Sequence, residues 1–326
     1  MSAIRMAAFL AAGMLATIAQ AADWVPTKQV EFIVAAGPGG ALDQVARVMK
    51  QLFEEQKILG DKPFIVVNRP GGAGKVAFDV LAARPGDPHV LALNTHGYLA
   101  SFIGGSLDVL PHRDFTSLAV LLDETVAVAV RADSPLTSAK DLVAALKRDP
   151  ASQRIAVATS IGNHIHVGVA KPLQAAGIDI GRLTVVPFKS SSDSIVALLG
   201  GHLEVVASTT PNIISQYQAG RIRLLALSSG ERLGGALAEV PTWREQGIDS
   251  EFRSSLGVVG AKGLSREQVA FWESAFKRLT QSEAWKRALA RTQSQPHFLT
   301  HADSLKFYEA EYANMRPMIE AMQLGK

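Results

Sequence analysis

Apolar residues between Val30 and Gln56 follow two different periods. The run from Val30 to Ala35 is mostly apolar and partly β-branched, which predicts a short buried strand. From about Leu42 to Gln56 the apolar residues instead recur with helical spacing, at Val45, Val48, Met49, Leu52 and Phe53. The segment Gly37-Pro38-Gly39-Gly40 separates the two patterns and prevents regular structure between them. The sequence therefore predicts a strand, a glycine turn and a helix, in this order.

The same alternation of strand and helix continues along the chain. Further strands are expected at residues 63–68, 89–94, 155–159, 183–187, 203–208 and 223–228. Further helices are expected at residues 75–83, 193–199 and 302–322, and after the capping-box spacings that begin at Ser138, Thr242 and Ser265. This alternation predicts an α/β fold with parallel strands. Ligands of such sheets bind beyond the carboxyl ends of strands, which here are the glycine turns and Asn94-Thr95.

The length of the chain predicts two lobes. About 305 residues follow residue 21, which exceeds the size at which a single core usually stops growing. Residues 118–131 form two apolar runs broken by Asp123-Glu124, where the chain is expected to enter a second lobe. The strand at 223–228 is expected to carry the chain back, and the terminal helix to pack on the first lobe. We therefore expect one lobe from residues 22–124 and 226–326, and the other from 125–225.

The first glycine turn has the chemistry of an anion site. Free backbone N–H groups at a helix N-terminus favour a carboxylate or phosphate, and glycine lets the ligand approach the backbone. The alternative is a strand-to-helix corner that binds nothing. Two nucleotide motifs are excluded: Leu42 and Asp43 occupy the region where the third glycine of a dinucleotide fingerprint belongs, and Gly74-Lys75 is followed by Val76 rather than Ser or Thr.

Residues 1–21 predict a signal peptide. Arg5 is followed by the apolar run 6–18 and by Ala19-Gln20-Ala21, which predicts cleavage after Ala21. The alternative is a membrane anchor, but the apolar run is shorter than the roughly 20 residues that span a bilayer. The chain has no cysteine, which excludes a disulfide, a thiolate metal site and a lipoprotein anchor. We expect an exported, soluble protein.

The charge of the chain gives no sign of a nucleic-acid partner. The 33 basic and 30 acidic residues give a formal net charge of +3, and removal of Arg5 with the signal peptide lowers this further. Aromatic residues are few, and no run of lysine and arginine stands out. Nucleic acid is therefore not an expected partner.

The order of several motifs resembles one family, the periplasmic receptors of tripartite tricarboxylate transporters, also called Bug-type receptors. The resemblance extends over residues 30–248 and is found again in GLSREQVAFW and EAWKRAL. Residues 252–264 and the helix around Trp272 resemble the tricarboxylate and citrate receptors of the family. The motifs, in chain order, are AAGPGGALDQVAR, VVNRPGGAGKVAF, RPGDPHVLALNT, VAVRADSPLTSAKDLVAALKRDP, VPFKSSSDSIVALLGGHLEVVAS, QAGRIRLLALSSGERL and VPTWREQGI.

The resemblance implies a periplasmic binding protein of type II, with two α/β lobes joined by crossover strands and a ligand cleft between them. Such a protein closes on a small carboxylate, here a citrate-like tricarboxylate or a dicarboxylate. It delivers this ligand to a transporter made of a large and a small membrane subunit. We expect a periplasmic monomer without cofactor or metal. The bound carboxylate, the identity of the transporter and its coupling ion are left open.

The resemblance also implies which residues contact the ligand, largely through backbone amides, hydroxyl groups and water. In the sequence, Ala41-Leu42 and the loop residues Ile161 and Asn163 depart from the common pattern, which leaves the distal specificity open. The site residues transferred from the resemblance, together with Asn94 and Thr95 from the strand ends, are Ala36, Gly37, Gly39, Gly40, Asp43, Asn94, Thr95, Ser160, Gly162, Asn163, His164, Lys189, Ser190, Ser191, Ser208 and Thr209.

Several of these residues have a simpler alternative role. Asp43 either orders the loop or a bound water, or merely complements the helix dipole. His164 and His166 are two positions apart and would lie on different faces of a helix, so we expect a solvent-facing or loop-stabilising role rather than a metal pair. Lys189 is either a carboxylate partner or a surface lysine. The serines at 190–192 are either ligand contacts or helix caps.

An enzyme and a ligand sensor are the two alternatives to a transport receptor. An enzyme is disfavoured because the sequence has neither a G-x-S-x-G segment nor a visible cluster of metal ligands. A sensor that presents its closed form to a signalling receptor would have the same fold. The first prediction is therefore a solute-binding protein, with the sensor as its alternative.

Overall fold

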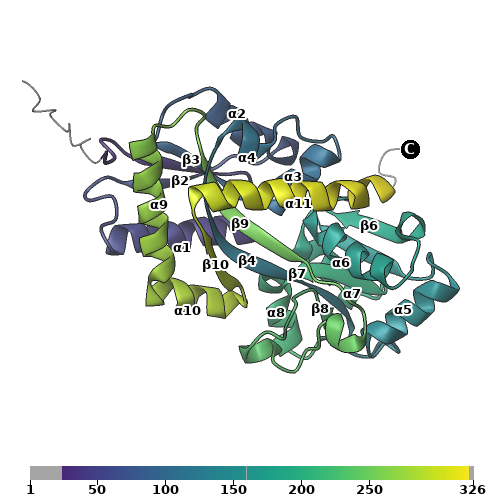
Figure 1. Cartoon of the computed structure of the whole chain (residues 1–326). Helices are drawn as coiled ribbons and strands as arrows, with labels where there is room; N and C mark the ends of the chain where they lie inside the picture. The colour runs from purple at the N-terminus through teal and green to yellow at the C-terminus, as the bar shows by residue number, and fades with distance from the viewer. Residues whose placement is uncertain (1–23, 159, 323–326) are drawn as a thin grey trace, which may run out of the picture.

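The computed structural model describes residues 24–158 and 160–322, so the predicted signal peptide lies outside the described residues. Its ten strands form one continuous sheet (Figure 1). The strands are β1 (Val30–Val34), β2 (Phe64–Asn68), β3 (Val90–Thr95), β4 (Thr116–Arg131), β5 (Arg154–Ala158), β6 (Thr184–Phe188), β7 (Val205–Thr209), β8 (Ile222–Leu227), β9 (Arg253–Gly260) and β10 (Gln295–Leu299).

Helices follow most of these strands and cover the sheet. They are α1 (Ala41–Glu55), α2 (Lys75–Ala82), α3 (His96–Ile103), α4 (Pro111–Asp114), α5 (Ala139–Arg148), α6 (His164–Ala175), α7 (Ser191–Leu199), α8 (Thr210–Gln218), α9 (Arg266–Gln281), α10 (Glu283–Thr292) and α11 (His301–Ala321). Four short 3-10 helices are η1 (Gly72–Gly74), η2 (Ile180–Arg182), η3 (Gly235–Leu237) and η4 (Arg244–Gln246). Within the described residues, no helix is long and apolar enough to span a bilayer.

The sheet has a parallel half on each side and an antiparallel centre. Its order is β2-β1-β3-β9-β4-β7-β5-β6, and β8 and β10 also pair with β4. Strand β1 is parallel to β2 and β3, and β5 is parallel to β6 and β7, as the alternation of strands and helices predicts. The expected α/β fold with two lobes is therefore confirmed.

Strand β4 connects the two halves. Its residues 116–125 pair with β9 in the first lobe, and its residues 126–129 pair with β7 in the second. The two apolar runs expected here are one strand, because Asp123 and Glu124 stay in register with Ser255 and Ser254 of β9. Figure 1 shows β4 and β9 crossing the molecule from one lobe to the other.

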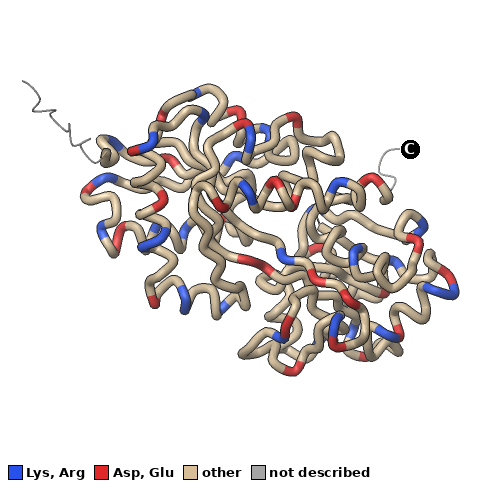
Figure 2. The backbone as a smooth tube through the Cα atoms, viewed as in Figure 1, with Lys and Arg blue, Asp and Glu red and all other residues tan. Residues whose placement is uncertain are grey.

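Each lobe has its own main hydrophobic cluster. In the first lobe, α1, α9 and α10 contribute Met49, Trp272 and Trp285 to a cluster with strands β1, β3, β4 and β9. In the second lobe, α5 and α6 pack on the other end of β4 and on β5 and β7. Basic and acidic residues are interspersed along the chain around these cores (Figure 2), in keeping with the small net charge.

The terminal helix α11 contacts both lobes, whereas the sequence predicted packing on the first lobe alone. Near its start, the Ser304 hydroxyl lies 3.0 Å from that of Ser117 on β4. Near its end, Met315 and Ile319 belong to the cluster that contains α6. The helix, yellow in Figure 1, therefore extends across the junction of the lobes, with its start beside β4 of the first lobe and its end packed with α6 of the second.

The chain stays beside the second lobe longer than expected. Strand β8 pairs with the second-lobe part of β4 instead of leading directly to the first lobe. Trp243, Ile248 and Phe252 then pack into the same cluster as α6. The chain next joins the first-lobe sheet as β9. The boundaries at 124/125 and 225/226 stay predictions.

Capping predictions hold where a helix follows. Ser138 and Ser265 each form a reciprocal capping box, with Asp141 and Gln268. Thr242 and Glu245 make the same pair of contacts, at 2.9 and 3.2 Å, but only the short 3-10 helix η4 follows them. Capping chemistry therefore predicts the start of a turn, and its continuation depends on the residues that come next.

Candidate functional site

The loop between β1 and α1 is held by Asp43. The Asp43 carboxylate accepts hydrogen bonds from the Gly39 N–H (2.8 Å), from Arg47 Nε (2.8 Å) and from Asn68 Nδ2 (2.9 Å). Asn68, the last residue of β2, also donates to the Ala36 carbonyl at 3.0 Å. Asp43 therefore orders the loop, which was one of its two expected roles.

These partners keep the Asp43 carboxylate ionised. Its pKa is lowered to about 2, mainly by the hydrogen bond from Arg47 and then by those from Gly39 and Asn68, against the opposing effect of burial. Asp43 is buried, so its carboxylate is committed to the protein rather than directed to solvent. It shapes the candidate anion site without offering it a negative charge at the surface.

The N-terminus of α1 has no side-chain cap. Its N-cap residue is Gly40, which has no side chain with which to bond the first helical amides. Gly37, Gly39 and Gly40 are exposed, and a Cβ added at Gly37 or Gly39 would meet nothing within 4 Å. Gly39 also has a φ of +82°, which favours glycine. The loop therefore presents an approachable backbone at the positive end of a helix dipole.

The loop between β5 and α6 is shaped by internal hydrogen bonds. Asn163 caps α6, since its Oδ1 accepts from the Ile165 and His166 amides at 3.0 Å each. The Gly162 amide donates to His166 Nδ1 at 3.0 Å. Ser160 is exposed. Of these predicted ligand residues, Asn163 and the Gly162 amide already have partners within the protein, and their visible role is to fix the loop.

His164 lies between the lobes rather than in solvent. A Cβ added at Gly97, in the first turn of α3, would lie 3.0 Å from His164 Nδ1. This nitrogen is buried and has no hydrogen-bond partner among residues 24–158 and 160–322. Burial, and secondarily the nearby His96, lowers the pKa of His164 to about 3, so the ring is neutral. Because α6 packs against α3, the ring does not face solvent, which was one of the two expected roles of His164.

The remaining predicted residues fall into caps and strand ends. Ser190 caps α7 by accepting from the Asp193 amide at 3.1 Å, Ser191 begins that helix, and Lys189 is exposed. Thr209 accepts from Asn212 Nδ2 at 2.9 Å, whereas the Ser208 hydroxyl is buried without a partner in the described part of the chain. The serine at 190 therefore has the capping role that was its alternative.

Thr95 and Asn94 end β3 at the junction. Thr95 caps α3 by accepting from the Gly97 amide at 3.1 Å. Asn94 is buried within the sheet, opposite Gly257 of β9. Thr95 lies opposite Leu256 on the face of the sheet that α1 covers. Of these two predicted site residues, only Thr95 lies on the same face of the sheet as α1, which follows the β1–α1 loop.

Two residues that were not predicted from the sequence, Glu124 and Ser254, also lie at the junction of the lobes. They lie opposite one another on β4 and β9. Alternate residues of a strand share one face, and Thr209 lies opposite Val126, the next position of β4 on that face. Thr95, Glu124, Thr209 and Ser254 thus form a buried polar row across four adjacent strands, here called the junction row.

The junction row separates the hydrophobic clusters of the two lobes. On β4, Leu122 precedes Glu124 on the same face and belongs to the first-lobe cluster, whereas Val126 follows it and belongs to the second. Burial raises the pKa of Glu124 to about 7, and a hydrogen bond with Thr209 opposes this rise. The sequence signal for Glu124 is a carboxylate inside an otherwise apolar strand, although Asp123-Glu124 predicted a break between two apolar runs.

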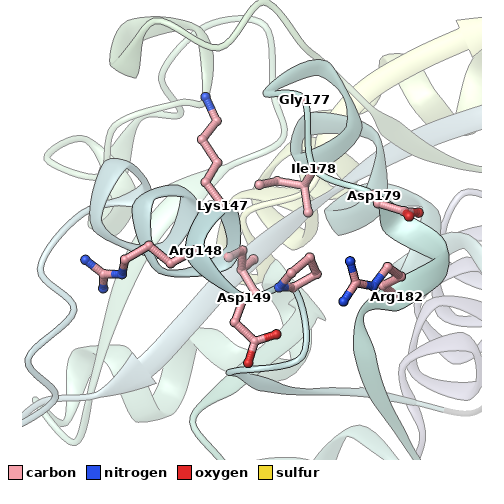
Figure 3. Close-up of a pocket in the computed structure, with 9 residues that line it drawn as sticks. Lys147, Arg148, Asp149, Gly177, Ile178, Asp179 and Arg182 are labelled. Carbon is pink, nitrogen blue, oxygen red and sulfur yellow. The ribbon is translucent and has the colours of Figure 1, made fainter.

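A depression of about 330 Å³ at the far end of the second lobe contains none of the predicted residues. It lies between the end of α5 and the turn after α6 (Figure 3). Lys147, Arg148 and Asp149 point in different directions there, so their charges do not converge on one point. We therefore do not assign a binding function to this depression.

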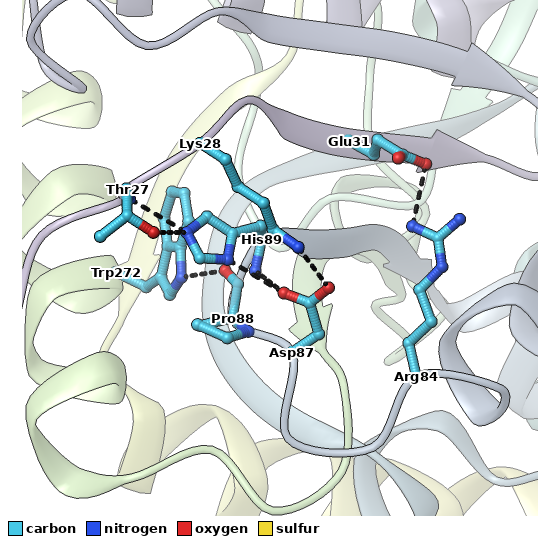
Figure 4. A network of polar contacts seen from close by, with 8 residues as sticks. All are labelled: Thr27, Lys28, Glu31, Arg84, Asp87, Pro88, His89 and Trp272. Carbon is cyan, nitrogen blue, oxygen red and sulfur yellow. Dashed lines mark hydrogen bonds and ion pairs between the residues drawn. The ribbon is translucent and has the colours of Figure 1, made fainter.

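A second depression, of about 440 Å³, lies at the amino ends of β1 and β3. Its charged residues are paired, with Lys28 to Asp87 and Arg84 to Glu31, each at 3.1 Å (Figure 4). His89 lies 3.0 Å from Asp87. Ligands of open parallel sheets bind at the opposite, carboxyl ends of the strands. This network therefore stabilises the base of the first lobe. The described residues contain no cluster of three or more His, Asp or Glu side chains that would hold a metal ion.

The fold is that of the type II periplasmic binding proteins. The solved periplasmic binding protein BugD superposes with a TM-score of 0.76 at 19% identity, over 92% of this chain and 99% of that one. MatC from Rhodopseudomonas palustris, with bound malate, gives 0.76 at 20% identity, over 90% and 99%. Rpa4515 of the same species, with adipate, gives 0.78 at 23% identity, over 91% and 98%.

The chain belongs to the tripartite tricarboxylate transporter receptor family, whose model matches residues 45–324. The UPF0065 protein in the gbd 5' region of Cupriavidus necator is 27% identical over 321 residues, which cover 98% of this chain and 95% of that protein. BugT of Bordetella pertussis is 26% identical over 294 residues, which cover 89% and 87%. The family expected from the order of motifs is therefore confirmed.

Proposed function

We propose that this protein is a periplasmic solute-binding protein that captures a small carboxylate between its lobes and delivers it to a tripartite tricarboxylate transporter. The observation that carries the proposal is the β1–α1 loop. Asp43 fixes a glycine backbone there while the start of α1 is left uncapped and open to an anion. Family membership and relatives solved with adipate and malate support the same class of ligand.

The proposed site combines the predicted residues of both lobes. The β1–α1 loop binds one carboxylate through backbone amides. The starts of α6, α7 and α8 face it from the second lobe and supply Ser160, His164, Lys189, Ser208 and Thr209. Hydrogen bonds within the protein shape these loops. They involve the side chains of Asp43, Asn163 and Ser190 and the amide of Gly162.

The proposed mechanism is closure of the lobes. A ligand that contacts both lobes favours the closed state only through the contacts that are absent in the open state. Charge-assisted hydrogen bonds contribute roughly 1.5–3 kcal/mol each, so a few of them suffice for micromolar affinity. The function is binding and release rather than catalysis. A di- or tricarboxylate is the proposed ligand, and the large and small membrane subunits are the proposed partners.

The proposal includes export and lobe boundaries. Cleavage after Ala21 would release residues 22–326 into the periplasm. We propose that the chain enters the second lobe near residue 125. We place its return at β9 rather than at residue 225, because Trp243, Ile248 and Phe252 pack with the second lobe.

The test is a thermal-shift screen of residues 22–326 against mono-, di- and tricarboxylates. A ligand at 100 times its Kd adds about 2.7 kcal/mol of stability and raises the midpoint. The variant Gly40→Asp then locates the anion. Gly40 has a φ of −73°, which aspartate tolerates as a helix cap, so the fold is kept while the new charge repels the ligand.

The matched control is Gly234→Asp. Gly234 also precedes a helix, has a φ of −81°, and has nothing within 4 Å of an added Cβ. The control should bind normally, whereas Gly40→Asp should lose about tenfold or more in affinity. Equal affinities of the two variants would place the anion elsewhere, and a protein that binds no carboxylate would contradict the proposed function.

A further inference from the structure

Glu124 is a buried carboxyl group without a cationic partner. Its residue is 5% exposed, and within residues 24–158 and 160–322 only the Thr209 hydroxyl interacts with its carboxyl group. The charged residues next to Glu124 and Ser254 along the paired strands are Asp123 and Arg253, which alternate with them and so lie on the opposite face. Asp123 is occupied there by Ser255 and His297.

A carboxyl group in this position is costly for the folded protein. Burial without a charged partner disfavours its ionised form, and a glutamine would fit the same space without that cost. The other buried acids, Asp43 and Asp123, each accept hydrogen bonds from several side chains or amides. Ser254, opposite Glu124, also has a buried hydroxyl without a partner in the described part of the chain. The Ser254 hydroxyl therefore lacks the contact that usually accompanies burial, and the neighbouring Glu124 carboxyl group lacks a cationic partner.

The two candidate binding loops belong to helices that pack next to this position. Helix α1 packs on the face of Leu122 and Leu256, which is the face of Glu124. Helix α6 packs on Val126, which is two residues after Glu124 on β4, since a Cβ added at Gly168 of α6 would lie 2.6 Å from Val126 Cγ2. Helices α1 and α6, whose N-termini are the candidate binding loops, therefore pack on the sheet on either side of the junction row. A solute held at the α1 loop and closed between the lobes would have Glu124 and Ser254 at its other end.

We propose that Glu124 is a specificity residue that pairs with a cationic nitrogen of the solute, so that the ligand is an amino carboxylate rather than a plain carboxylate. This inference rests on the proposed function. The carboxylate of the ligand binds the α1 loop, its ammonium group donates to Glu124, and the Ser254 and Thr209 hydroxyls complete the contacts. The ligand supplies the positive charge that the protein lacks at this point.

The pairing has a measurable consequence for protons. An ammonium group beside Glu124 stabilises its ionised form, so binding near neutral pH releases a proton from the protein. A second carboxylate at the same place would have the opposite effect, because it would favour the protonated acid and take up a proton. His164 and His166 at the start of α6 are held neutral by burial and do not obscure this difference above pH 7.

The experiment is titration calorimetry of residues 22–326 with three matched pairs of solutes. The pairs are glutamate and glutarate, aspartate and succinate, and 4-aminobutyrate and butyrate. We expect the amino member of at least one pair to bind about 10- to 100-fold more tightly, as a charge-assisted contact implies. Buffers of different ionisation enthalpy should show proton release at pH 7. Glu124→Gln should abolish both effects, and Glu239→Gln, at an exposed position, should retain them.

Three outcomes would overturn the inference. Equal or tighter binding of the plain carboxylates, with proton uptake or none, would leave the proposed function intact and remove the role given to Glu124. An amino preference that persists in Glu124→Gln would place the cation contact at another residue. A wild-type protein that binds none of the six solutes but responds to a tricarboxylate in the thermal-shift screen would overturn this inference alone, and one that binds no carboxylate at all would also contradict the proposed function.

Discussion

Asp43 and Glu124 are both buried carboxyl groups, yet their surroundings favour opposite charge states. Asp43 accepts from Arg47, Gly39 and Asn68, and its pKa is lowered to about 2. Glu124 has only the Thr209 hydroxyl, and its pKa is raised to about 7. Burial disfavours ionisation at both positions, so the difference lies in the partners. The comparison shows that one carboxyl group is used to build a loop, whereas the other has no charged partner in the described part of the chain.

Asp43 and Glu124 also differ in the sequence separation between each residue and its neighbours in the fold. Asp43 takes two of its three donors from residues four positions away, Gly39 and Arg47. The junction row instead joins residues from four strands that are far apart in sequence. A locally built loop keeps its shape whenever the first strand and helix form. The row exists only when both lobes and the crossing strands are in register.

The largest effect that we predict is the pH dependence of stability caused by Glu124. The pKa of its folded form, about 7, lies above the ordinary 4.5, so the folded protein binds more protons in this range. The resulting stability is complete below pH 4.5 and is lost as the pH rises to 7. Between pH 5 and 8, the wild type should therefore lose about 2–3 kcal/mol relative to Glu124→Gln.

Urea unfolding at the two pH values measures this difference. The exposed Glu239→Gln serves as the control and should follow the wild type at both values. A constant difference between the wild type and Glu124→Gln would show that Glu124 has the same charge state folded and unfolded. The contrast with Asp43 would then be lost.

The next effect concerns Asp43. Asp43→Ala removes the acceptor for Gly39, Arg47 and Asn68 and should lower the free energy of unfolding by about 2 kcal/mol at pH 7. The pKa of folded Asp43 is below its ordinary value, so the stability is present above pH 3.8 and is lost as the pH falls towards 2. The loss measured by urea unfolding should therefore be smaller at pH 3 than at pH 7.

Asp193→Ala is the matched control for Asp43. Asp193 also lies in the first turn of a helix, but it is exposed. Its replacement should change stability by no more than about 1 kcal/mol, the usual effect of a helix dipole. Equal losses for the two variants would mean that Asp43 only complements the dipole.

The smallest effect concerns His166, which is buried like Glu124 but is basic. Burial lowers its pKa to about 4, so its stabilising effect is present above the ordinary 6.5 and is lost as the pH falls towards 4. His166→Asn keeps an acceptor for the Gly162 amide but cannot be protonated. From pH 7 to 5, the wild type should lose about 1–2 kcal/mol relative to this variant.

Chemical unfolding of the two proteins checks this prediction, with the exposed His202→Asn as the control. The pH dependence of His166 should be opposite in sign to that of Glu124, because burial favours the neutral form of an acid and of a base alike. Parallel curves for the wild type and His166→Asn would indicate that water reaches the ring of His166.

Local patterns in the amino-acid sequence were enough to predict much of the secondary structure. Periods of apolar residues predicted the strands of both parallel halves and helices α1, α2 and α7, but not α3 or α8, and the glycine turn after Val34 was found where expected. The capping boxes at Ser138 and Ser265 were also predicted, because they depend on residues three positions apart. The order of motifs was sufficient for the family.

Which residues meet at the junction of the lobes depends on how distant strands pair. Glu124 and Ser254 face one another because β4 and β9 pair in one register, and a shift of one residue would turn both to the other face. The packing of α11 across both lobes, and of Trp243 with the second, also depends on surfaces that form only when distant segments assemble. Sequence patterns report the period of a segment, whereas contacts between segments are set by register and packing.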